Sequence, residues 1–397
     1  MVVGGGPAVT ESPLRALHAS HRTGPKDGEV RSENRGSYGG HMHDQPTVLG
    51  AMSEGGHELV VHATDEASGL RAIVAIHSTV LGPALGGTRF YPYPDEASAL
   101  TDVLRLSSGM TLKAAAAGLD LGGGKAVIIG DPGADRSDAL LEAYGRVVET
   151  LGGAYVTAED VGTTVEDMAV VARSTTHVKG LPIEQGGSGD PSPMTARGVV
   201  ASMRAVAAYL WDDPALAGHT VAIQGVGKVG AALAEMLADG GANLIVADVD
   251  TERCGEVAER TGALAVDPEK ILQVRCDVFA PCALGGALSA ESIPRLECQS
   301  VVGSANNQLA TREDAGRLAE AGILYAPDFV VNAGGIVNIS VELDPDPYSA
   351  ARASERVDRI FDRITEILDA ARADAVTPLS AAERLAYERI AARAAAV

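Results

Sequence analysis

The chain has 397 residues, 46% of them hydrophobic, and a formal net charge of −21. This length and apolar content suffice for two domains with separate cores. The negative charge disfavours nucleic acid and anionic membranes as partners, because it offers no positive field to attract phosphates. No apolar run approaches the roughly 20 residues that cross a bilayer, and the N-terminus lacks a secretion-signal pattern. We therefore expect a cytoplasmic protein that acts on small molecules.

The beginning of the chain, residues 1–50, is rich in Gly, Ser, His and charge and has almost no apolar periodicity. Such a segment cannot bury enough surface to offset its chain entropy. We predict a disordered tail here, followed by a substrate-binding and oligomerisation domain over residues 51–189.

Alternating apolar and β-branched residues in 58–78 predict a β-hairpin that turns at 67–69. Helical spacing of apolar residues predicts a helix over 95–113, a glycine turn at 122–124, and then a buried strand. A second helix over 137–151 precedes a short strand, AYVTA, at 154–158. The pattern of this half is α/β.

The segment GGSGDPSP at 186–193 is dense in Gly, Ser and Pro, which predicts a domain boundary and hinge. Strands expected at 220–224, 242–247, 277–280, 300–303 and 323–326 alternate with helical patterns, so a parallel, doubly wound sheet is predicted for residues 190–344. The Ala- and Arg-rich residues 345–397 read as two helices, beginning near 349.

The predicted strand TVAIQ runs into a G-x-G-x-x-G fingerprint and then a helix, the context in which this motif is typical of dinucleotide binding. Backbone N–H groups and the dipole at a helix N-terminus favour a pyrophosphate. Asp248 ends the next strand at the spacing of a ribose-binding acid, which favours NAD over NADP. Asp250 is the alternative candidate for the ribose-binding acid. The fingerprint residues expected to bind the cofactor are Gly225, Val226, Gly227, Lys228, Val229 and Gly230.

The cysteines and histidines give no sign of a metal centre. Cys254, Cys276, Cys282 and Cys298 form no C-x-x-C pair, and no H-E-x-x-H motif occurs. We expect no metal, no disulfide framework and four reduced thiols, which makes a metal-dependent hydrolase the weaker alternative.

Several motifs together carry a family resemblance: PALGGTRFYPY, GMTLKAAAAGLDLGGGKAVIIGDP, TAEDVGTT, GSANNQLA and YAPDFVVNAGGI. From about residue 58 to the C-terminus, the chain resembles the leucine/valine/phenylalanine dehydrogenase family, and most closely its valine-specific members. The resemblance implies an NAD-dependent amino acid dehydrogenase that forms homo-oligomers, with the C-terminal helices returning to the first domain.

The resemblance also implies roles for individual residues. Lys113 would hold the substrate carboxylate with help from Asn307, Lys125 would be the general base, and Asp160 would receive the amino group and relay protons. A lysine base must be neutral, so an alkaline activity optimum is expected. Further cofactor contacts implied by the resemblance are Thr195, Asn306 and Asn332.

The substrate pocket implied by the resemblance is apolar. Leu85 stands where glutamate dehydrogenases carry a lysine for the side-chain carboxylate, and an apolar wall cannot pair a buried carboxylate. Many family members have valine where this chain has Ile336 and Ile339, so the pocket should be smaller and favour valine. The substrate-binding residues expected are Leu85, Gly86, Gly87, Met110, Ala158, Asn307, Ile336 and Ile339. A leucine or phenylalanine dehydrogenase and a non-catalytic NAD-sensing protein stay open as alternatives.

Overall fold

A computed structural model describes residues 47–396, and the predicted disorder of residues 1–46 lies outside them. The predicted tail boundary at residue 50 is wrong, because helix α2 already spans Val48–Gly55. The Thr47 side chain caps this helix by accepting a hydrogen bond from the Gly50 N–H group.

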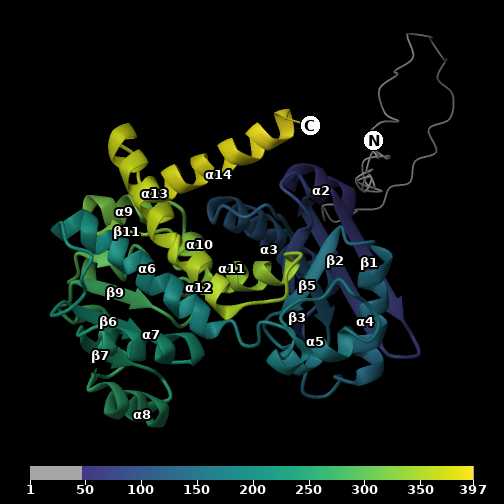
Figure 1. Cartoon of the computed structure of the whole chain (residues 1–397), viewed down its shortest axis with the longest axis horizontal. Helices are drawn as coiled ribbons and strands as arrows, with labels where there is room; N and C mark the ends of the chain where they lie inside the picture. Colours follow the sequence, from purple (N-terminus) through teal and green to yellow (C-terminus); the bar gives the residue numbers. More distant parts are fainter. Residues whose placement is uncertain (1–46, 397) are drawn as a thin grey trace, which may run out of the picture.

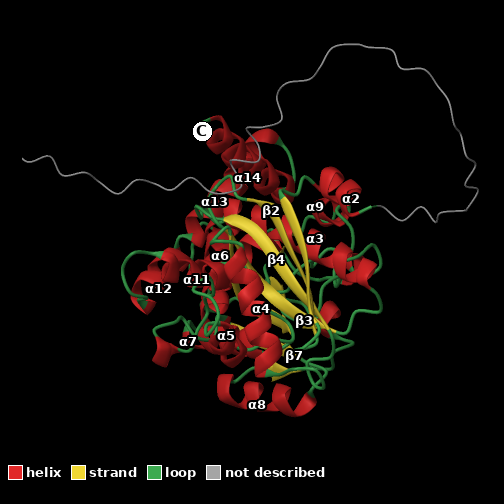
Figure 2. Cartoon of the chain, turned by 90° about the vertical axis from the view of Figure 1, so that its right-hand side faces the viewer, coloured by secondary structure: helices red, strands yellow, loops and turns green. Residues whose placement is uncertain are grey.

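The first half of the chain forms a five-stranded mixed sheet in the order β1-β2-β4-β3-β5. Strands β1 and β2 form the predicted hairpin, and β2 pairs antiparallel with β4, whereas β3 runs parallel to both β4 and β5. Figure 2 shows β2, β4 and β3 side by side with α4 in front of them. The strands are β1 Leu59–Asp65, β2 Leu70–Ser78, β3 Ala84–Tyr91, β4 Gly122–Ile129 and β5 Tyr155–Glu159.

The three consecutive glycines at 122–124 belong to strand β4, so the predicted glycine turn is wrong. These glycines let neighbouring elements pack close to the strand, and they do not reverse the direction of the chain. A Cβ atom on Gly123 would lie 2.1 Å from the backbone nitrogen of Thr111 in the neighbouring helix, and one on Gly124 would lie 2.6 Å from the Tyr155 ring. Glycine is needed where another backbone comes this near.

Two helices predicted in this half are confirmed, each with a side-chain cap at the expected start. Asp95 caps α3 by accepting a hydrogen bond from Ser98 N, and Ser137 caps α4 in the same way through Leu140 N. The helices here are α3 Glu96–Ala116, α4 Asp138–Thr150 and α5 Val165–Val171.

The second half contains the predicted parallel sheet, in the order β11-β10-β9-β6-β7-β8. Its strands are β6 Thr220–Gln224, β7 Asn243–Ala247, β8 Leu264–Ala265, β9 Val278–Pro281, β10 Ser300–Val301 and β11 Leu324–Tyr325. The α-helices that accompany them are α6 Ser192–Trp211, α7 Lys228–Asp239, α8 Thr251–Thr261, α9 Asp314–Glu320, α10 Asp328–Val331 and α11 Gly334–Ser340. Strand β8 was not predicted, because it contains only two residues, within the short run Ala-Leu-Ala-Val at 263–266.

Three helices, not the predicted two, follow residue 349: α12 Ala350–Asp358, α13 Ile360–Asp374 and α14 Pro378–Ala395. Helices α12 and α13 pack on α6, and α14 contacts α3, so the expected return to the first domain is confirmed for α14. Figure 1 shows α14 extending from the second half toward α3. Among residues 47–396, no helix is long and apolar enough to cross a membrane.

Candidate active site

A cavity of about 970 Å³ lies between the two halves of the molecule. Residues of the first sheet and of α3 line one side, and residues of α6, α7 and α11, together with Asn306 and Asn332, line the other. The predicted site residues that it brings together are Leu85, Gly86, Gly87, Met110, Lys113, Lys125, Ala158, Asp160, Thr195, Lys228, Val229, Asn306, Asn332, Ile336 and Ile339.

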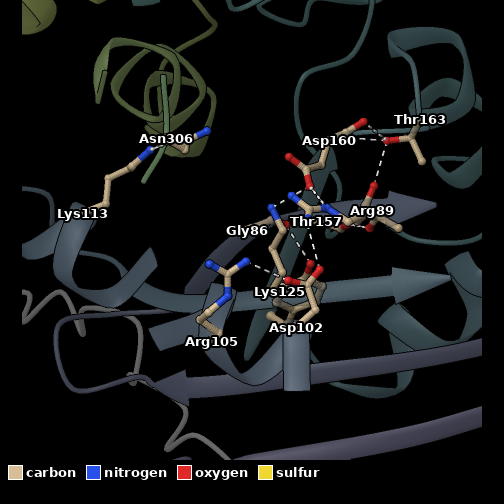
Figure 3. A network of polar contacts seen from close by, with 12 residues as sticks. Gly86, Arg89, Asp102, Arg105, Lys113, Lys125, Thr157, Asp160, Thr163 and Asn306 are labelled. Carbon is tan, nitrogen blue, oxygen red and sulfur yellow. Dashed lines mark hydrogen bonds and ion pairs between the residues drawn. The ribbon is translucent and has the colours of Figure 1, made fainter. Parts of the chain in front are cut away.

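Lys125 and Asp160 form an ion pair on the first side of the cavity. Lys125 lies within β4 and is only 6% exposed, and its Nζ atom is 2.9 Å from Oδ2 of Asp160, which directly follows β5. Arg89 of β3 donates to the same carboxylate oxygen from Nε at 3.3 Å. Figure 3 shows the three side chains converging from neighbouring strands. The parallel pairing of β3 with β4 and with β5 therefore assembles this group.

Lys113 lies in the last turn of α3 and reaches across to the second half, where its Nζ atom donates to Oδ1 of Asn306 at 3.3 Å. The same Oδ1 atom accepts a hydrogen bond of 2.9 Å from Asn332. Asn332 also donates to the Ser304 carbonyl at 3.1 Å. These contacts hold a lysine ammonium at the junction of the two halves.

Burial, with the charge of nearby Lys125 adding to it, lowers the pKa of Lys113 to about 8, although the buried Asp328 carboxylate acts in the opposite direction. Burial alone would raise the pKa of Asp160, but the charges of Lys125 and Arg89 outweigh it and hold that pKa below its usual value. Asp160 is thus a carboxylate at neutral pH, while Lys113 is a cation that loses its proton within reach of mildly alkaline pH.

Apolar side chains wall the cavity beside these charges. Leu85, Ala158, Ile336 and Ile339 are each less than a tenth exposed, and Met110 of α3 is partly buried. The charged residues come from the same elements: Lys113 lies on α3 with Met110, and Asp160 directly follows β5, which carries Ala158. This wall fits an aliphatic side chain and offers a carboxylate no partner.

The predicted dinucleotide turn has the backbone features that a pyrophosphate needs. Gly225 has φ of 95°, which favours glycine, and a Cβ on Gly230 would lie 2.0 Å from the Gly225 carbonyl oxygen. A Cβ on Gly227 would meet nothing within 4 Å, and no side chain caps the start of α7 at this residue. The uncapped helix N-terminus and the open space above Gly227 fit a bound phosphate group.

Asp248 lies directly after β7, close to this turn. Its carboxylate accepts hydrogen bonds from the backbone N–H groups of Val226 at 2.7 Å and Asp250 at 2.9 Å, and it pairs with Arg253 at 2.8 Å. Val226 itself is fully buried, so it supports Asp248 through its backbone rather than facing the cavity. Asp250, the alternative candidate for binding the ribose, caps α8 by accepting a hydrogen bond from the Arg253 N–H group.

Asn306 and Asn307, the adjacent asparagines, lie differently with respect to the cavity. Asn306 contacts Lys113 and lines the cavity, whereas Asn307 is absent from the lining. Asn307 has a positive φ of 52°, so the backbone turns sharply between the two side chains. In this structure Asn306, rather than Asn307, contacts Lys113, and the assistance that Asn307 gives to substrate binding stays a prediction.

Sequence reasoning missed Arg89 and Glu159, both near the reacting groups. Arg89 is positioned by Asp102, which accepts from its Nη1 atom at 2.8 Å. Glu159 lines the cavity next to Asp160, and burial together with the charge of Asp190 raises its pKa to about 7. Both residues stand within the quoted motifs, at GGTRF and AEDVG, but nothing in their spacing marks them as part of a site.

Comparison with known proteins follows the same division of the chain. Residues 57–177 match the family model described as the Glu/Leu/Phe/Val dehydrogenase dimerisation domain, and residues 186–262 and 245–396 match the model of glutamate/leucine/phenylalanine/valine dehydrogenase. The chain belongs to this family. It is an amino acid dehydrogenase, an oxidoreductase that acts on CH–NH₂ donors.

Members of the family cover nearly the whole described chain. A leucine dehydrogenase of Thermoactinomyces intermedius is 48% identical over 343 residues, which are 86% of this chain and 93% of that protein. A valine dehydrogenase of Streptomyces coelicolor is 50% identical over 341 residues, 85% and 93% of the two chains. The crystal structure of L-tryptophan dehydrogenase from Nostoc punctiforme is 40% identical, with a TM-score of 0.76 over 87% of this chain and 99% of that one.

Proposed function

We propose that this dehydrogenase catalyses the reversible, NAD-dependent oxidative deamination of a branched-chain L-amino acid, with valine favoured, to the 2-oxo acid, ammonium and NADH. The observation that carries the proposal is an apolar wall in the same cavity as Lys113, Lys125 and Asp160. Related leucine and valine dehydrogenases of 48 and 50% identity support a branched-chain substrate.

Lys113, Asp160 and Lys125 each have a separate role in the reaction of the amino acid. The Lys113 ammonium binds the substrate carboxylate, and Asn306 orients that ammonium. The Asp160 carboxylate accepts a hydrogen bond from the substrate amino group. Lys125, whose Nζ atom lies 2.9 Å from Asp160, takes the proton of the water that attacks the iminium carbon and shares it with Asp160.

The cofactor site supports the proposal of NAD as the cofactor. When bound, NAD accepts the hydride from the substrate Cα atom. Gly225, Gly227 and the N-terminus of α7 would hold its pyrophosphate, and Thr195, Asn306 and Asn332 line the cavity between that turn and Lys113. The Asp248 carboxylate next to the turn repels a 2′-phosphate, which favours NAD over NADP.

The preference for valine is proposed from pocket volume. Ile336 and Ile339 on α11 face Leu85 and Ala158 of the first sheet across the cavity. One methylene in an apolar pocket changes discrimination by about 1 to 3 kcal/mol. Two isoleucines where many family members have valines should therefore disfavour leucine and phenylalanine.

The first experiment is NADH formation from NAD and L-valine, L-leucine, L-phenylalanine or L-glutamate, each assayed separately at alkaline pH. We expect the highest kcat/KM with valine, and activity that Lys125→Ala abolishes while NAD still binds. A preference for leucine or phenylalanine would overturn the valine assignment alone. Inactivity with every amino acid, combined with intact NAD binding, would instead favour a non-catalytic NAD-sensing protein.

We also propose that the enzyme is a homo-oligomer. Residues 57–177 match a domain described by its part in dimerisation, and strand β1 lies at the edge of the first sheet. Light scattering coupled to size-exclusion chromatography tests this assembly, and a monomeric mass would reject it.

A further inference from the structure

Cys276 and Cys298 lie side by side at the start of the neighbouring strands β9 and β10. The isolated bridge between Arg275 and Glu297 and the strand pair Val278 with Ser300 share one register, in which partners differ by 22 positions. The same offset aligns Cys276 with Cys298. A hydrogen bond of 3.1 Å from Cys276 N to the Glu297 carbonyl holds this alignment.

The distance between aligned residues suits a disulfide. Neighbouring strands lie about 4.7 to 4.9 Å apart, and the Cα atoms of disulfide-bonded cysteines are usually about 4.4 to 6.8 Å apart. Both cysteines precede their strands and lie between the bridge of Arg275 with Glu297 and the first strand pair, Val278 with Ser300. Aligned side chains on adjacent parallel strands point to the same face of the sheet.

The surroundings give the two thiols different properties. Cys276 is 8% exposed within an apolar cluster of the second half, and Cys298 is more exposed at the edge of the same cluster. The neighbouring Cys276 thiol lowers the pKa of Cys298, whereas Cys298, together with burial, raises the pKa of Cys276. Cys298 is thus the more accessible thiol and the readier to ionise, and Cys276 stands behind it.

We propose that Cys276 and Cys298 form a thiol pair that a peroxide oxidises reversibly to an intramolecular disulfide. Cys298 thiolate attacks one peroxide oxygen, an S–O bond forms as the O–O bond breaks, and the departing oxygen leaves as water after protonation. The Cys276 sulfur then attacks the sulfenic sulfur, an S–S bond forms as the S–O bond breaks, and a second water leaves. The thiols lose two protons and two electrons, and the peroxide is reduced to two waters.

This pair is remote from the dehydrogenase chemistry. It lies at the amino ends of β9 and β10, whereas the fingerprint turn and Asn306 follow the carboxyl ends of strands in the same sheet. Its test therefore does not depend on the proposed substrate.

The test uses the full-length native protein treated with hydrogen peroxide, followed by alkylation of remaining thiols and peptide mapping without reduction. We expect one new linkage, between the peptides that contain Cys276 and Cys298, which dithiothreitol reverses. A linkage through Cys254 or Cys282, a linkage between chains, or over-oxidised Cys298 beside a free Cys276 would overturn the proposal.

A variant series separates pairing from simple exposure. In Cys276→Ser, Cys298 has no resolving thiol, so peroxide should carry it to sulfinic acid that dithiothreitol does not restore. Cys254→Ser removes a buried cysteine on α8 and should leave the disulfide unchanged. Full recovery of Cys298 in Cys276→Ser would contradict the pairing, and the wild-type peptide map decides the matter if that variant does not fold.

Discussion

At the scale of single residues, the site depends on two lysines whose neighbours differ. Lys125 is paired with Asp160 inside the first sheet, whereas Lys113 reaches an amide on the other half of the molecule. The pairing of Lys125 with Asp160 couples the proposed base to a proton acceptor. The position of Lys113 presents a cation to the carboxylate of a substrate that enters between the two halves. This difference gives each lysine its own role and its own test.

Lys113 should set the alkaline limit of substrate capture. Its pKa is lowered to about 8, so the free enzyme carries the ammonium below that pH and loses it above. We expect kcat/KM for the amino acid to fall as pH rises through 8, because kcat/KM reports the free enzyme. A bound carboxylate favours the ammonium, so kcat should persist to higher pH.

Profiles of kcat and kcat/KM against pH measure this difference. In Lys113→Arg the guanidinium stays charged throughout, so whatever activity remains should lack the fall above pH 8. An unchanged alkaline limb in that variant would assign the limb to another group.

The side-chain preference should change with the volume at α11. Ile336→Val and Ile339→Val each remove one methylene from the cavity wall, so the kcat/KM ratio of leucine to valine should rise about tenfold or more per substitution. Ile367→Val is the matched control, because Ile367 is equally buried but lies on α13 outside the cavity lining. A similar rise in the control would mean that the effect is not one of pocket volume.

At the scale of elements, the approach of α3 to β4 positions Lys113 relative to Lys125. Gly123 permits this approach, since a Cβ there would lie 2.1 Å from the backbone of Thr111. Lys113 lies two residues after Thr111 in α3, and Lys125 lies two residues after Gly123 in β4. Any displacement of the helix from the strand therefore also separates the two lysines.

Gly123→Ala should therefore force α3 away from β4. We expect a lower melting temperature and a kcat/KM for the amino acid reduced by at least tenfold, because Lys113 moves with α3. Gly109→Ala is the control within α3, where an added Cβ meets nothing within 4 Å and alanine favours the helix by about 0.5 to 1 kcal/mol. Equal activity of the two variants would show that this contact does not position Lys113.

At the scale of the whole molecule, Glu342 connects the segments between the two halves. Its Oε1 atom accepts hydrogen bonds from the N–H groups of Gly180 at 3.0 Å and Ser188 at 2.8 Å. Gly180 and Ser188 lie in the segment that leads from the first half into α6, and Glu342 follows α11. One carboxylate therefore connects the segment that enters the second half with the segment that leaves it. Ser188 lies in the segment predicted as a hinge, so we expect closure of the cavity to bend the molecule here.

Glu342→Ala leaves two backbone donors without their acceptor, and hydrogen bonds to a charged group contribute about 1.5 to 3 kcal/mol each. We expect a lower kcat and a smaller decrease in radius of gyration, measured by small-angle X-ray scattering, when NAD and valine are added together. Glu355→Ala, at an exposed position on α12, should behave like the wild type. Normal compaction in Glu342→Ala would exclude Glu342 from the closing motion.

Much of the architecture was predictable from local patterns. The hairpin, helices α3 and α4 with their capping residues, and the parallel strands around the fingerprint all follow from apolar periodicity and end signals, because these depend on neighbours in the chain. The wrong predictions have a common cause. The glycines at 122–124 form a strand because a distant helix needs the space, and the break at Arg359 that divides α12 from α13 carries no proline or glycine.

The sequence by itself determined the chemical inventory: the lysines, the aspartate, the glycine turn and the apolar residues of the pocket, each recognisable within a motif. Only the tertiary structure decided which of them meet. Asn306 rather than Asn307 faces Lys113 because the backbone turns through a positive φ, and Arg89 joins Asp160 because β3 lies next to β5. Cys276 and Cys298 become neighbours through strand register. Contacts between residues far apart in the chain depend on register and backbone direction, which no local pattern contains.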